Sequence, residues 1–81
     1  MAKEDVMQQE LARLSAAIGS GPTAELYMER GRLYNKGGVL DKALNDFLKA
    51  EQLAPGNEEA QSYIALLLEI FEYHYMDYYN P

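Results

Sequence analysis

Apolar residues recur along this chain at steps of three and four, in four stretches separated by glycine- and proline-containing turns. The first stretch predicts a helix over residues 3–18, because its apolar positions share one helical face: Met7, Leu11, Leu14 and Ile18. Gly19-Ser20-Gly21 is expected to end this helix, since glycine readily takes the left-handed conformation common at helix C-termini. Pro22 and Thr23 suit the start of the next helix, with threonine as its cap.

The second stretch, which runs to about residue 36, carries two apolar stripes about a quarter-turn apart. One stripe consists of Ala24, Tyr27, Gly31 and Tyr34, and the other of Leu26 and Leu33. Because each stripe needs a surface to bury it, we expect this helix to pack between two neighbouring helices.

Two further helices follow the turn at Gly37-Gly38. The third has a single apolar face, made of Leu40, Ala43, Leu44, Phe47 and Ala50, and Pro55-Gly56 interrupts the chain after it. Asn57 is expected to cap a fourth helix over residues 58–78, with acidic residues in its first turn, where the helix dipole favours them. Short turns make successive helices antiparallel. The pattern therefore predicts an all-α single domain over residues 1–81, with about four helices.

The 34 residues from Ala24 to Asn57 also show a fixed spacing of aromatic, small and proline positions: Tyr27, Gly31, Tyr34, Ala43, Phe47, Ala50 and Pro55. Gly31 and Ala43 are small enough for two helices to approach closely, and the aromatic rings fill the space on either side. Pro55 cannot continue a helix. In length and spacing this stretch resembles the tetratricopeptide (TPR) repeat, a helix-turn-helix unit of the α-α superhelix type.

The resemblance is partial on both sides of this hairpin. The helix over residues 3–18 resembles the second half of a preceding repeat, with Leu14 and Ala17 in matching places. The helix over residues 58–78 resembles the first half of a following one and would act as a capping helix. We therefore expect half a repeat, a whole repeat and another half.

The resemblance implies a non-catalytic scaffold for protein–protein interaction. In TPR proteins the first helices of successive hairpins line a groove that binds peptides or proteins. Transferred by position, the groove residues here include Met28, Arg32, Asn35, Tyr63, Leu66 and Glu69. The partner would be a protein or peptide whose identity the sequence does not give.

The fourth helix has more apolar surface than the preceding hairpin can cover. At the helical step of ~100° per residue, one face holds Ile64, Leu67, Phe71, Tyr75 and Tyr78, and a second holds Leu66, Ile70 and Tyr73. The terminal units of repeat proteins usually have a polar outer surface. We therefore expect the second face to be buried by self-association, as a homodimer through the C-terminal helix.

Composition and charge narrow the choice of partners. The seven basic residues all lie at or before Lys49, so the acidic residues that follow supply the whole net charge of −6. Such a surface repels phosphate, and we expect neither nucleic acid nor membrane as a partner. The N-terminal residues are charged throughout, and no apolar stretch approaches the ~20 residues of a membrane span, so a cytoplasmic location is expected.

Candidate chemistry is sparse. The sequence has no cysteine and one histidine, His74, which lies three residues before Asp77. Di-metal helical bundles use Glu-x-x-His pairs on two helices, but Phe71 stands where the glutamate would be. We therefore expect no cofactor and no enzyme activity. The alternative is a small ligand- or metal-binding bundle, or an enzyme, that uses the acidic C-terminal helix.

Overall fold

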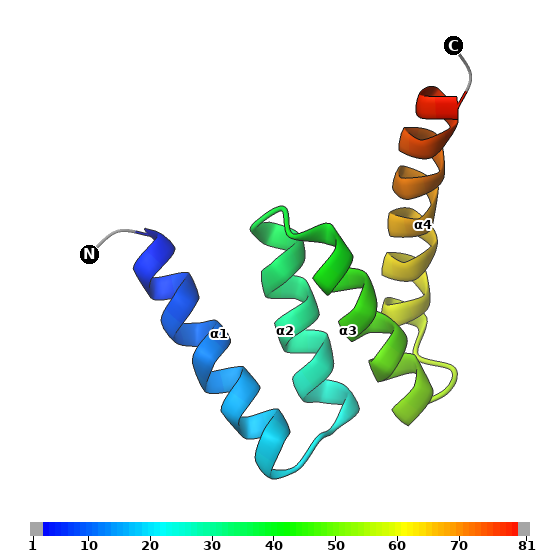
Figure 1. Ribbon diagram of the computed structural model, residues 1–81. Helices are drawn as coiled ribbons and strands as arrows, with labels where there is room; N and C mark the ends of the chain where they lie inside the picture. Colours follow the sequence, from blue (N-terminus) through cyan, green and yellow to red (C-terminus); the bar gives the residue numbers. More distant parts are fainter. Residues whose placement is uncertain (1–2, 80–81) are drawn as a thin grey trace.

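The computed structural model describes the backbone of residues 3–79 and the side chains of residues 5–73. Within these residues the protein is all-α. Its four helices are α1 (Lys3–Ser20), α2 (Ala24–Lys36), α3 (Leu40–Leu53) and α4 (Glu58–Tyr79). Figure 1 shows them side by side in chain order, each running roughly antiparallel to the one before. The predicted class and number of helices are confirmed.

Two of the helix starts are fixed by the predicted caps. The Thr23 hydroxyl oxygen accepts a hydrogen bond from the Leu26 amide at 3.1 Å, and the Asn57 carboxamide oxygen accepts one from the Ala60 amide at 3.0 Å. Each side chain satisfies an amide that has no partner inside its own helix. These contacts set where α2 and α4 begin.

The end of α1 differs from the sequence prediction. The helix continues through Gly19 to Ser20, and the Gly21 amide still donates to the Ala17 carbonyl at 3.0 Å. Among the described glycines, only Gly38 (φ 79°) and Gly56 (φ 89°) take the left-handed conformation. The expected left-handed stop at Gly19-Ser20-Gly21 is therefore wrong. Pro22, which has no amide hydrogen to donate, follows directly.

The closest helix crossing lies between α2 and α3, where the sequence places its small residues. A Cβ atom built on Gly31 would lie 2.8 Å from a ring carbon of Phe47, which is shorter than any ordinary contact. The Phe47 ring is fully buried and stacks on Tyr63 of α4, with ring centroids 4.3 Å apart. The crossing therefore requires glycine at position 31, because the Phe47 ring lies between Gly31 of α2 and Tyr63 of α4.

The core extends from this crossing into α4. Its buried members are Met28, Ala43, Phe47, Ala50, Ala60 and Leu67. Partly buried aromatic and aliphatic side chains surround them, including Tyr27, Tyr34, Ile64 and Phe71. The α2–α3 hairpin and the first half of α4 thus share one apolar core.

A buried ion pair also joins α2 to α3. The Arg30 guanidinium donates two hydrogen bonds to the Asp46 carboxylate, at 2.8 and 2.9 Å, and a third to the Ser15 hydroxyl of α1 at 3.1 Å. The Asp46 side chain is only 5% exposed. The hydrogen bonds from Arg30 to Asp46 raise the pKa of Arg30, so the guanidinium stays charged. Sequence analysis did not predict this pair.

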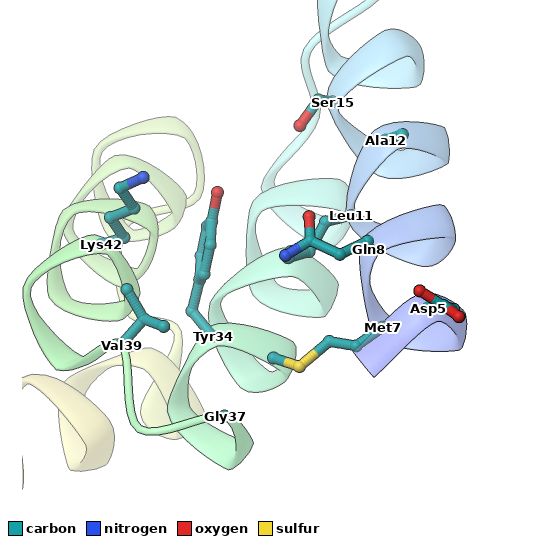
Figure 2. A pocket seen from close by; sticks show the side chains of 10 residues that line it. All are labelled: Asp5, Met7, Gln8, Leu11, Ala12, Ser15, Tyr34, Gly37, Val39 and Lys42. Carbon is teal, nitrogen blue, oxygen red and sulfur yellow. The ribbon is translucent and has the colours of Figure 1, made fainter. Parts of the chain in front are cut away.

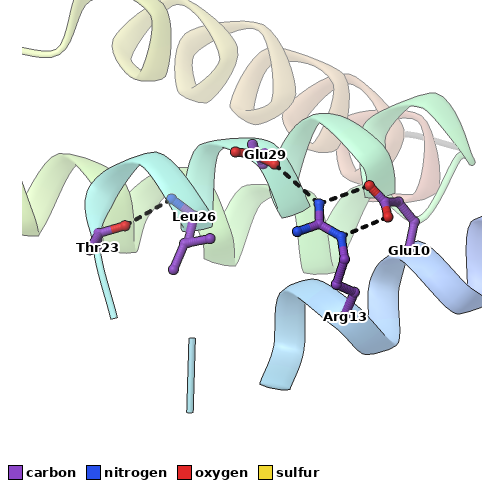
Figure 3. A network of polar contacts seen from close by, with 5 residues as sticks. All are labelled: Glu10, Arg13, Thr23, Leu26 and Glu29. Carbon is purple, nitrogen blue, oxygen red and sulfur yellow. Dashed lines mark hydrogen bonds and ion pairs between the residues drawn. The ribbon is translucent and has the colours of Figure 1, made fainter. Parts of the chain in front are cut away.

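The first helix is attached less firmly. Leu14 is buried, and the Arg13 guanidinium donates to both Glu10 carboxylate oxygens at 2.8 and 2.9 Å, with Glu29 of α2 at 3.7 Å (Figure 3). These charges are exposed to solvent, where an ion pair contributes little to stability. In Figure 1, α1 and α2 form a V that opens toward the N-terminus.

Candidate functional site

The last helix carries two apolar faces, and the α2–α3 hairpin covers only one of them. On the covered face, Ala60 and Leu67 are fully buried. On the neighbouring face, Leu66 is 50%, Ile70 37% and Tyr73 70% exposed. Both predicted faces are confirmed over the described side chains; Tyr75 and Tyr78 lie outside them.

The geometry of α4 explains why this second face stays open. The helix is longer than α2 and α3, and its C-terminal half extends past the α2–α3 turn (Figure 1). α4 is also the last helix of the row, so the hairpin lies on one side of it only (Figure 1). Fully burying a leucine or isoleucine stabilises by about 1.5–3 kcal/mol relative to exposure, so half-exposed side chains leave part of that free energy unused.

The exposed side chains line a shallow hollow of about 390 Å³, made of Leu66, Glu69, Ile70 and Tyr73. These four residues are called the α4 face below. They include two of the predicted groove residues, Leu66 and Glu69, and all three of the predicted self-association residues. The predicted self-association surface and part of the predicted groove are therefore the same surface of α4.

The predicted groove residues of α2 do not line this hollow. Arg32 donates to the Glu59 carboxylate of α4 at 3.1 Å, with both side chains largely exposed. Glu59 precedes Leu66 by seven residues, or two helical turns, so the ion pair continues the line of the α4 face toward α2. Asn35 is half-buried in the last turn of α2. The two helices thus meet at an ion pair and not at a shared cavity.

Two groove predictions need correction. Met28 is 3% exposed and belongs to the core, so its side chain is not available to a partner. Positional transfer placed it in a groove, but the Met28 side chain packs into the apolar core that α2 shares with α3 and α4. Tyr63 is half-buried and uses one ring face to stack on Phe47, at an interplanar angle of 3°. Its main role is structural.

The motif residues also have structural roles. Tyr27, Gly31, Tyr34, Ala43, Phe47 and Ala50 lie in or against the α2–α3 core, and Pro55 lies in the turn after α3. Tyr27 and Tyr34 also flank the Arg30 guanidinium, 5.7 and 5.9 Å from their ring centroids. None of them is a surface residue of the α4 face.

The charged residues of α4 itself are all acidic or histidine. Glu69 lines the hollow and Glu72 is exposed on the same helix; neither makes an ion pair with another described residue. Near the N-terminal end of α4, Glu51 of the neighbouring helix α3 accepts hydrogen bonds from the Gln61 side chain and the Gly56 amide, at 3.1 and 3.2 Å. These hydrogen bonds lower the pKa of Glu51, with Gln61 contributing most. Since no lysine or arginine follows Lys49, the part of the chain that contains α4 is strongly anionic.

A larger cleft of about 630 Å³ lies inside the V between α1 and the α2–α3 turn (Figure 2). Its walls are mixed, with Asp5 and Gln8 on one side and Tyr34 and Lys42 on the other. The Lys42 ammonium lies 5.8 Å from the Tyr34 ring centroid, so part of its charge is already engaged. The described residues that line this cleft bring no set of polar groups to one point.

Among the described side chains, no three His, Asp or Glu residues are grouped so that they could hold a metal ion. His74 and Asp77 lie outside these side chains. Over the described helices, none combines the length and apolar character needed to cross a bilayer.

We compared the chain with models of protein families, with curated proteins and with solved structures, and none of them matches.

Proposed function

We propose that this protein is a non-catalytic scaffold of the tetratricopeptide type, which binds another protein or peptide through the α4 face. The single observation that carries this proposal is the exposure of Leu66, Ile70 and Tyr73 around one hollow, beside a face of the same helix that packs into the core. Contiguous apolar surface of this kind often marks an interaction site in a soluble protein.

The residue spacing from Tyr27 to Pro55 supports the same proposal. In a TPR array, α4 would occupy the place of the first helix of a repeat. Such a helix has an apolar surface prepared for a neighbour. A second copy of this chain could provide that neighbouring helix by forming a homodimer.

The functional residues we assign are Leu66, Glu69, Ile70 and Tyr73, with Arg32 and Glu59 extending the surface toward α2. Burial of a partner's apolar side chains against this surface would supply the affinity, and the surrounding carboxylates would supply selectivity.

Photo-crosslinking in the cells that naturally make the protein tests this function. A photoreactive residue at position 66 should give a discrete protein adduct. The same residue at position 48 is the matched control, since Leu48 of α3 is 45% exposed and lies off the α4 face. Equal adducts at both positions, or no adduct at position 66, would refute a specific interaction at α4.

A further inference from the structure

The α4 face combines three apolar side chains with one carboxylate, Glu69, and this combination restricts what it can bind. We infer that its partner is a basic amphipathic helix: a segment with apolar residues at helical spacing and lysine or arginine beside them. This inference rests on the proposed scaffold function and names the chemistry of the partner.

The charges favour a basic partner. Glu69 lies among the apolar side chains of the hollow, so any partner that covers Leu66 and Ile70 also removes water from around this carboxylate. A carboxylate that loses water without gaining a partner charge opposes binding. None of the described basic residues forms an ion pair with Glu69, and α4 contains no lysine or arginine. The compensating charge must therefore come from the partner.

The same charges disfavour a second copy of the chain. A two-fold contact through the α4 face would bring each Glu69 close to its counterpart near the centre of the contact. The basic residue nearest along the surface, Arg32, already pairs with Glu59. A homodimer would thus bury like charges together, whereas a basic segment would neutralise them.

The backbone of α4 favours a helical partner over an extended one. In the middle of a helix the amides and carbonyls are hydrogen-bonded within the helix, so α4 offers only side chains at this surface. An extended peptide would place its own unpaired amides against Leu66 and Ile70. A helix satisfies its backbone internally and can pack its side-chain ridges between those of α4. From Leu66 to Tyr73 the face spans two turns, or ~10 Å, which matches apolar positions i, i+3 or i+4, and i+7.

Two designed peptides test the inference against the full-length chain. Both carry leucines at i, i+4 and i+7 on an alanine-rich helix; one has lysines beside the leucines and the other has glutamates there. By fluorescence anisotropy at ~50 mM salt, the lysine peptide should bind at least about tenfold more tightly. Raising the salt to ~500 mM should reduce this difference, because exposed charges are then screened.

Variants of the chain assign the binding to the α4 face. The double change Leu66→Ser and Ile70→Ser should weaken the lysine peptide by about tenfold or more, as loss of two central apolar contacts does. Leu68→Ser is the matched control, since Leu68 is 49% exposed on the same helix but does not line the hollow, and it should leave affinity unchanged. Glu69→Lys should lower affinity for the lysine peptide and raise it for the glutamate peptide. Circular dichroism checks that each variant is folded.

Three results would overturn the inference: equal binding of both peptides, no binding of either at millimolar concentration, or a wild-type dimer that the Leu66→Ser and Ile70→Ser change disrupts. The last would make a second copy the occupant. A crosslinked partner at position 66 together with tighter binding of the glutamate peptide would leave the scaffold function standing and refute only the basic helix. Absence of both crosslinking and peptide binding would refute both proposals.

Discussion

Because α2 and α3 approach closely at Gly31, we predict that even the small substitution Gly31→Ala disturbs the packing of the core. The new Cβ atom would lie 2.8, 3.0 and 3.1 Å from three ring carbons of Phe47. The ring cannot swing aside, because it is fully buried and stacked on Tyr63. Either the ring tilts out of its stack or α2 and α3 separate, and overpacking of this kind costs about 1–3 kcal/mol.

The helical propensity of alanine works in the opposite direction. Replacing glycine by alanine inside a helix stabilises by about 0.8–1.0 kcal/mol, so the net change at Gly31 is about 0–2 kcal/mol of destabilisation. Gly19 separates the two effects, since it lies within α1 and a Cβ atom there meets nothing within 4 Å. Gly19→Ala should therefore be neutral or stabilising. The difference between the two variants isolates the crossing.

Thermal and urea unfolding followed by circular dichroism measure this difference. A domain of this size shifts its Tm by roughly 4–8 °C per kcal/mol, so each kcal/mol of overpacking at Gly31 should lower the Tm of Gly31→Ala by that amount relative to Gly19→Ala. Gly31→Leu, which adds a branched side chain at the same place, should melt lower still. A Tm for Gly31→Ala equal to or above that of Gly19→Ala would refute the close crossing.

Three further predictions concern charge and metal. Asp46→Ala should lower the free energy of unfolding by about 2–4 kcal/mol in urea titrations, because it leaves the mostly buried Arg30 guanidinium unpaired; an unchanged midpoint would contradict the role of the pair. Hydrogen bonds lower the pKa of Glu51 below its ordinary value of 4.5, so ionised Glu51 stabilises the fold above that pH, and this stabilisation is lost as the pH falls. The Tm of Glu51→Gln should therefore fall less on acidification than the Tm of the wild type. Equal decreases in Tm would contradict a stabilising role of ionised Glu51. Calorimetric titration with zinc or magnesium should give no stoichiometric heat, whereas the metal-binding alternative requires one.

Much of the fold follows from local patterns in the sequence. Thr23 and Asn57 cap the predicted helices because a side-chain oxygen at these positions has an unpaired amide within reach. Gly31 and Phe47 meet because a small residue and a large one face each other across antiparallel helices. The helix α1 ends within the predicted Gly19-Ser20-Gly21 stretch but without the expected left-handed glycine, because glycine permits that conformation and does not require it.

The site was harder to predict, because exposure depends on how far each neighbouring helix reaches. Periodicity separates the two faces of α4, yet only the structure shows that Leu66 and Ile70 remain exposed while Met28 is covered. The Arg30–Asp46 pair left a trace in the sequence, since Asp46 lies on the apolar face of α3 beside Phe47. Periodicity alone does not reveal which residue neutralises such a charge 16 positions away.

The central claim, that the α4 face is the binding surface, is tested most directly by nuclear magnetic resonance. The isotope-labelled chain would be titrated with the lysine peptide, and the perturbed residues would be mapped on the structure. The account predicts that perturbations concentrate at Leu66, Glu69, Ile70 and Tyr73, with Leu48 and Val6 unchanged although both are exposed. Perturbations centred instead on the cleft beside α1, at Gln8 and Lys42, or no perturbation at all, would contradict it.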